Sequence, residues 1–165
     1  MMFAWFPDGR QVLAMIATRQ GRCALIRCRT DEKNLPIEPV VSAEAHTIAF
    51  EAPALSPDGR AVAVELWRSE TGGDRTLQGI GVIPVDAAAP LRIRTLRDAD
   101  RLKIVIKGDA RTPQWSRDGS RLLFSRVRPD GRADICVADK DGRNERNLTN
   151  GKGDNYDATW SPSDQ

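Results

Sequence analysis

Apolar residues in this chain occur in short runs that end at polar turns, and no segment carries a sustained apolar stripe with the 3.6-residue period of a helix. Runs such as "VLAMIA" (12–17) and "LLFS" (122–125) have the length of buried strands. The pattern therefore predicts an all-β chain.

Two segments depart from this simple pattern. The segment 94–108 is the best helical candidate, but "LKIVIK" (102–107) within it alternates as a strand does. We expect it to form a longer loop or a long outer hairpin. "LPIEPVVS" (35–42) contains two prolines. They favour an outer edge strand, because proline has no N–H to donate to a neighbouring strand.

One turn recurs along the chain with the same flanks. It reads "FPDGR" at Asp8, "SPDGR" at Asp58 and "SRDGS" at Asp118, and a fourth copy begins as "WSPSDQ" with Ser163 in the equivalent place. The intervals are 50, 60 and 45 residues. They lie at or somewhat above the roughly 40–50 residues of a propeller blade, so a repeat architecture is predicted.

Each interval also contains the signals of further strands. In the third copy, Asp-Gly pairs at 130–131 and 141–142 lie between strand-like segments, and Gln20-Gly21 takes the place of the first pair in the first copy. An Asp-Gly pair supplies the positive φ angles that a tight hairpin requires. Each unit is thus predicted to be a meander of about four antiparallel strands. The residues assigned to these turns are Asp8, Gly9, Asp58, Gly59, Asp118, Gly119, Asp130, Gly131, Asp141 and Gly142.

Together these residues resemble the WD-like propeller repeat of the TolB family, whose hallmark is a W-S-P-D-G turn, an apolar strand, an Asp-Gly hairpin and a closing Leu-Thr. The third copy matches best, from Trp115 to the "LT" at 148–149. It departs from the hallmark at Arg117 and Cys136, and the second copy has Leu55 in place of the tryptophan. The resemblance implies an all-β fold, a β-propeller of four-stranded antiparallel blades of the six-bladed TolB type.

On this resemblance the blades fall at about residues 3–52, 53–112 and 113–157, with the start of another blade at 158–165. Trp5, Trp115 and Trp160 precede the turn at equivalent places, so we expect them to act as wedges between adjacent blades. Propellers close with about four to eight blades, and three blades would leave apolar faces at both ends. Either the chain is part of a longer propeller, or a second copy completes a six-bladed ring.

Charge and hydropathy limit the classes of partner that can be expected. The 165 residues carry a net charge of only +2, with no clustered basic stripe, so no nucleic-acid partner is expected. No apolar run approaches the 18–20 residues or so of a membrane span, and no membrane insertion is expected. The start "MMFAWFPDGR" is unlike a signal peptide. The expected location is cytoplasmic, or periplasmic if the chain is a piece of a TolB-like protein.

Candidate chemistry is sparse, and no catalytic residue, cofactor or metal site is predicted. A Ser-His-Asp triad would need His46, and no G-x-S-x-G elbow is present. Cys23 and Cys28 lie five residues apart on one expected strand and point to opposite faces, so they can neither pair nor share an ion. The acidic stretches "DKDG" (139–142) and "GDNYD" (153–157) lack the ligand series of a calcium loop.

The leading hypothesis is a non-enzymatic β-propeller that serves as a scaffold or protein-binding module. The resemblance to TolB implies protein partners at one mouth of the ring or through its loops. The alternative is the propeller portion of a prolyl-oligopeptidase-like serine peptidase, whose catalytic domain is absent from this chain. A third reading, a small-molecule or sugar binder, is disfavoured because aromatic residues make up only 5% of the chain.

Overall fold

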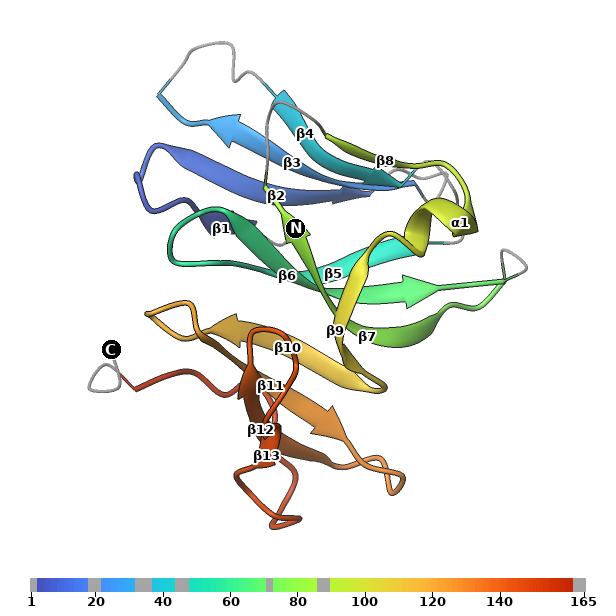
Figure 1. Cartoon of the computed structure of the whole chain (residues 1–165), viewed down its shortest axis with the longest axis vertical. Helices are drawn as coiled ribbons and strands as arrows, with labels where there is room; N and C mark the ends of the chain where they lie inside the picture. Colours follow the sequence, from blue (N-terminus) through green and yellow to red (C-terminus); the bar gives the residue numbers. More distant parts are fainter. Residues whose placement is uncertain are drawn as a thin grey trace.

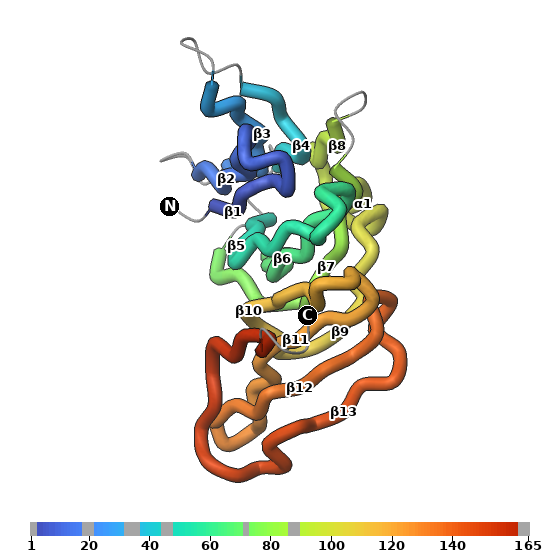
Figure 2. Tube along the Cα trace, turned by 90° about the vertical axis from the view of Figure 1, so that its left-hand side faces the viewer, coloured from blue at the N-terminus to red at the C-terminus, as the bar shows by residue number. Residues whose placement is uncertain are grey.

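The computed structural model describes residues 3–17, 22–31, 37–43, 48–70, 73–85 and 90–161. Within these residues the chain forms three sheets that follow one another along the long axis of the molecule (Figure 1, Figure 2). The predicted all-β fold with four-stranded antiparallel units is confirmed, and the three sheets are not closed into a ring.

The first sheet has the order β1-β2-β3-β4-β8. Its strands are β1 (Phe3–Trp5), β2 (Gln11–Ala17), β3 (Cys23–Arg29), β4 (Ile37–Ala43) and β8 (Leu91–Ile93). The first four strands are antiparallel neighbours in chain order. The Gln20-Gly21 turn expected between β2 and β3 lies outside the described residues.

The second and third sheets are antiparallel and have four strands each. The second comprises β5 (Ile48–Leu55), β6 (Ala61–Arg68), β7 (Thr76–Pro84) and β9 (Lys103–Lys107). The third comprises β10 (Ala110–Trp115), β11 (Arg121–Val127), β12 (Ala133–Asp139) and β13 (Arg146–Asn147). The first strand of each sheet begins a few residues before the boundaries expected from the repeats, at Ile48 and Ala110 instead of about residues 53 and 113.

The segment 94–108 is neither a plain loop nor one outer hairpin. The strand β8, just before it, pairs with β4 in parallel, so the chain returns from the second sheet to the first. It then passes through the short helix α1 (Leu96–Ala99), which begins at a capping box formed by Thr95 and Asp98. The predicted strand at 102–107 is present as β9, which closes the outer side of the second sheet.

The same strand β8 corrects the prediction that 35–42 is an edge strand. β8 pairs with Val41–Ala43, so β4 lies inside the sheet. Pro39 is tolerated because it lies before the parallel contact, next to a register shift in the β3–β4 pairing.

The first strands of the second and third sheets each contain a β-bulge at the same place in the repeat. In β5 and β10 the register shifts between Glu51 and Ala54 and between Arg111 and Gln114. Within these shifts Ala52 has φ 45° and Thr112 has φ 50°. Asp157, at the equivalent place of the fourth copy, has φ 54°. The backbone therefore repeats more faithfully than the side chains, since three unrelated residue types adopt the same left-handed conformation.

The core consists of layers between successive sheets. Along β6, Val62 and Val64 pack toward the first sheet, while Ala63 packs toward the third. Along β11, Leu122 and Phe124 pack toward the second sheet. A middle sheet with apolar side chains on both faces is what stacked blades require, because each blade buries both faces against its neighbours.

Candidate functional site

The recurring Asp-Gly turns share one geometry. At Asp118 the carboxylate accepts hydrogen bonds from the Ser116 hydroxyl at 2.6 Å and from the Ser120 N–H at 3.0 Å. Gly119 has φ 68°, and its N–H donates to the Ser116 carbonyl at 2.9 Å. The turn at Asp58 repeats these bonds with Ser56 and Arg60.

The first turn, at Asp8, keeps the backbone pattern but has Phe6 in place of the serine. Asp8 accepts from the N–H groups of Arg10 and Gln11 at 2.9 and 3.2 Å. Gly9, at φ 64°, donates to the Phe6 carbonyl at 3.0 Å. In each recurring turn the residue before the loop donates its N–H to the carbonyl five residues later, as Ser116 does to Arg121. Each is therefore a four-residue hairpin loop, in which a type I turn is followed by a left-handed glycine.

These hydrogen bonds hold the turn carboxylates in their charged form. The Ser116 hydroxyl, then the Ser120 N–H and hydroxyl, hold the pKa of Asp118 far below its ordinary value of 3.8. The Ser56 hydroxyl and the Arg60 N–H lower the pKa of Asp58 in the same way. Such groups are suited to stabilising turns and unsuited to taking up a proton near neutral pH.

The other two predicted hairpins are three-residue loops, one residue shorter, and each ends at a left-handed glycine. Gly131 and Gly142 have φ 83° and 85°, and their N–H groups donate to the carbonyls of Arg128 and Asp139 at 2.9 and 2.8 Å. They differ in what lies next to them. A Cβ on Gly131 would meet nothing within 4 Å, whereas one on Gly142 would lie 1.8 Å from the Val105 carbonyl oxygen of β9. The turn at 141–142 therefore packs directly on the second sheet.

Two of the three tryptophans predicted as wedges repeat one contact between a sheet and the chain that follows it. The Trp115 indole N–H donates to the Ala54 carbonyl of the second sheet at 3.0 Å. The Trp160 indole N–H donates to the Gln114 carbonyl of the third sheet at 3.4 Å, and Gln114 and Ala54 hold equivalent places in their repeats. The described end of the chain thus lies against the third sheet, beside β10 and β11 (Figure 2).

Among the described residues, Trp5 makes no equivalent contact with a preceding sheet. It lies on β1, the first edge strand of the first sheet, and is 55% exposed. Phe3 and Ile16 of the same sheet are also exposed. At the opposite end, Ala158 and Trp160 cover the outer apolar face formed by Leu123, Ile135 and Val137.

A buried carboxyl at the contact between the second and third sheets was not anticipated from the sequence. Glu65 of β6 is 5% exposed, and it accepts the Thr112 N–H at 2.8 Å and the Trp67 indole N–H at 3.3 Å. Burial raises the pKa of Glu65, and the two N–H donors oppose that rise. Its role is to satisfy the amide that the bulge at Thr112 frees from the sheet. The signal was present in "AVAVELW", where one acid interrupts an apolar run.

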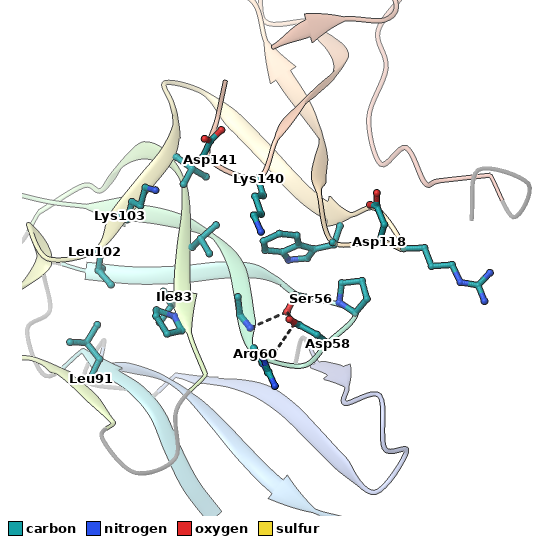
Figure 3. Close-up of a pocket in the computed structure, with 18 of the residues that line it drawn as sticks. Ser56, Asp58, Arg60, Ile83, Leu91, Leu102, Lys103, Asp118, Lys140 and Asp141 are labelled. Carbon is teal, nitrogen blue, oxygen red and sulfur yellow. Dashed lines mark hydrogen bonds between the residues drawn. The ribbon is translucent and has the colours of Figure 1, made fainter. Parts of the chain in front are cut away.

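A hollow of about 790 Å³ opens between the second and third sheets, at the ends that carry the recurring turns (Figure 3). The structure brings predicted turn residues from both sheets to it, namely Asp58, Asp118, Gly119 and Asp141, together with Trp115. Asp8 and Asp130 do not line it. Leu91 and Leu102, which flank α1 in the chain, also line the hollow. Neither leucine belongs to a turn motif. Figure 3 places these two leucines at one end and Asp118 at the other.

The remaining candidate groups stay outside this hollow. Cys23 and Cys28 lie on one strand, as predicted, and these two and Cys136 are free thiols. Burial raises the pKa of the Cys136 thiol to about 11. His46 and Ser163 lie outside the described residues. In the part of the chain that the structure describes, no three His, Cys, Asp or Glu side chains are grouped to hold a metal, and no helix is long and apolar enough to span a membrane.

Comparison with known proteins identifies the fold. No family model and no curated protein matches the chain. Among solved structures, it is similar to a putative TolB from Agrobacterium tumefaciens, with a TM-score of 0.60 and 18% identity over 90% of this chain and 49% of that one. It is also similar to a puromycin-hydrolyzing peptidase from Mycobacterium tuberculosis, with a TM-score of 0.55 and 19% identity over 82% of this chain and 23% of that one.

A third similar structure is prolyl oligopeptidase B from Galerina marginata, with a TM-score of 0.55 and 18% identity over 89% of this chain and 22% of that one. The chain therefore spans about half of the putative TolB and less than a quarter of each peptidase. At these identities the likeness concerns the fold alone. The chain has a TolB-like, propeller-type fold, and it is a propeller module whose sheets are not closed.

Proposed function

We propose that this propeller module binds a protein partner at the end that carries the recurring turns and contributes no catalytic group. The observation that carries the proposal is the hollow between the second and third sheets. Its volume of about 790 Å³ lies within the range of about 300–1,000 Å³ usual for binding pockets. Loops held by a rigid scaffold are common binding elements, and three packed sheets provide such a scaffold here.

The chemistry of the lining supports binding over catalysis. Ser56 donates its hydroxyl to Asp58 and accepts the Ala61 N–H at 2.9 Å, so it is fully engaged in its turn. Asp118 is held by three donors. A nucleophile or a general base needs a group that can change its bonds or its proton near neutral pH, and the carboxylates of these turns are poor candidates.

A second candidate function is the propeller portion of a serine peptidase. Two of the three similar structures described above are peptidases, of which this chain would match less than a quarter. The full reading frame separates the two functions. A downstream α/β-hydrolase segment whose serine reacts with a fluorophosphonate probe would favour the peptidase, and its absence would favour the binding module.

A site-specific cross-linking experiment tests the binding function. A photoreactive benzoyl-phenylalanine replaces Arg117 at the hollow or, as the control, Arg132 in the β11–β12 hairpin at the opposite end of the same sheet. Both positions are exposed. On irradiation in cells, we expect protein adducts of defined mass from position 117 and none from position 132. Equal adducts from both positions, or none from position 117, would contradict the proposal.

A further inference from the structure

The hollow combines an apolar floor with a charged rim. The floor is formed by side chains of the second sheet, of the chain around α1 and of β10, namely Val82, Pro84, Leu91, Leu102, Val105 and Trp115. Val82, Leu91, Val105 and Trp115 are only partly buried, so they present apolar surface to a ligand. An exposed apolar surface of this kind, bordered by charges, is typical of an interaction site.

The acidic side chains of the rim are already engaged. Asp58 and Asp118 accept the hydrogen bonds of their own turns. Asp141 accepts from the Arg143 N–H at 3.1 Å and from the Arg143 guanidinium at 2.7 Å. These three carboxylates are therefore directed into the protein's own turns and offer little to a cationic ligand.

The basic side chains of the rim are exposed, and none of them forms a salt bridge with a described residue. They are Arg60, Arg101, Lys103, Arg117 and Lys140. Other arginines of the same sheets do have carboxylate partners, such as Arg126 with Glu145 and Arg68 with Asp100. Five cations that form no salt bridge with a described residue therefore border the opening of the apolar floor to solvent.

We propose that the hollow binds an extended, acidic segment of a partner protein, in which carboxylate and apolar side chains alternate. This inference rests on the proposed binding function and names the chemistry of its ligand. Successive side chains of an extended peptide point to opposite sides. Apolar side chains can then face Trp115 and Leu91 while the carboxylates face the cations of the rim. Nucleic acid fits less well, because a phosphodiester backbone would leave the apolar floor uncovered.

The test uses short fluorescein-labelled peptides in which Glu alternates with Leu or Phe, and matched peptides with Lys in place of every Glu. We expect fluorescence polarisation to show binding of the acidic peptides only. Affinity should fall as NaCl is raised from about 50 to about 500 mM, since salt screens exposed charge pairs. Acidic and lysine peptides that bind equally, or neither binding at all, would overturn the proposed ligand chemistry.

A charge exchange locates the binding. The double variant R117E/K140E should weaken the acidic peptide about tenfold or more and should gain binding of the lysine peptide. The matched control R132E/K152E makes the same charge change on exposed residues away from the hollow and should bind as the unchanged chain does. Urea unfolding of each variant verifies that it is folded.

Four further outcomes are decisive. Equal weakening by both double variants, or loss without the gain of the lysine peptide, would overturn the placement in the hollow. The proposal would also be overturned if single-stranded DNA binds where the acidic peptide does not and R117E/K140E abolishes that binding. The ligand of the hollow would then be nucleic acid. If the peptides fail while position 117 still cross-links to a protein, the binding function stands and only the ligand chemistry is wrong.

Discussion

The glycines of the turns illustrate how one residue type serves two purposes. At Gly131 the structure requires only a positive φ, whereas at Gly142 it also requires the absence of a side chain, because β9 passes directly beside it. The sequence shows the same Asp-Gly pair at both places. The difference arises from the packing of the third sheet on the second.

This difference gives a matched pair of variants. Gly131→Ala should cost about 1–2 kcal/mol, the strain of a left-handed alanine. Gly142→Ala should cost at least about 2 kcal/mol more, since its Cβ would overlap the Val105 carbonyl oxygen and force the two sheets apart. Urea unfolding measures both. Equal losses of stability would show that the turn does not press on β9.

Asp118 gives a prediction about acid stability. Its turn donors hold its pKa below the ordinary value of 3.8 in the folded chain. A lowered pKa contributes stability that is present above 3.8 and is lost as the pH falls through the folded value. Asp118→Asn should therefore be less stable than the unchanged chain at pH 7. The difference between their urea midpoints should shrink from pH 4 toward about pH 2. A constant difference across that range would contradict the assignment.

At the scale of elements, the sequence allowed turns formed by neighbouring residues to be predicted, but not pairings between strands far apart in the chain. The recurring turns could be predicted because aspartate, serine and glycine act within a few residues of the chain. The bulge hid the start of β5, since "EAP" (51–53) interrupts the strand pattern and Ala52 has no sequence signal for its φ of 45°. The parallel pairing of β8 with β4 joins residues about fifty positions apart, which no local pattern reveals.

The candidate site was predictable only in part, for the same reason. Asp58, Asp118 and Trp115 were singled out as turn and wedge residues, but nothing in their motif says that two turns meet at one hollow. Leu91 and Leu102 join them through the return of the chain to the first sheet. Their side chains are ordinary apolar residues, and only the fold gives them a place in the site.

The return strand β8 is thus predicted to be a structural element. Ile93→Ala should cost about 2–4 kcal/mol, because Ile93 is fully buried among side chains of the first and second sheets. Arg92→Ala, at the exposed neighbouring position of the same strand, should change stability by no more than about 0.5 kcal/mol. Thermal or urea unfolding compares them. Similar small effects would mean that β8 is dispensable for the core.

The wedge tryptophans can be ranked by how much each contributes to the stability of the isolated chain. Trp115→Phe should cost about 1–2 kcal/mol, because it removes the indole donor to the Ala54 carbonyl in a partly buried layer. Trp5→Phe should change the stability of the isolated chain little, since Trp5 is 55% exposed. Urea unfolding measures both losses of stability, and equal losses for the two variants would refute the ranking.

At the scale of the whole molecule, the two ends of the stack are complementary in repeat position. The first sheet presents Trp5, which is 55% exposed, and the third sheet presents the Gln114 carbonyl, which accepts the Trp160 indole N–H. If a second copy completes a six-bladed ring, the Trp5 of one copy takes the place of Trp160 on the other. The contact would then repeat the one that Trp115 makes with Ala54.

This pairing predicts opposite effects of two tryptophan variants. The unchanged chain should sediment at micromolar concentration with twice its monomer mass of 18.2 kDa. Trp5→Ser should give a folded monomer, because it removes the docking group from an exposed position. Trp160→Ala should strengthen the dimer, because it uncovers the carbonyl and the apolar face of the third sheet that the partner needs. A monomeric mass for the unchanged chain, or a dimer weakened by Trp160→Ala, would exclude head-to-tail closure and leave the end faces to other segments or partners.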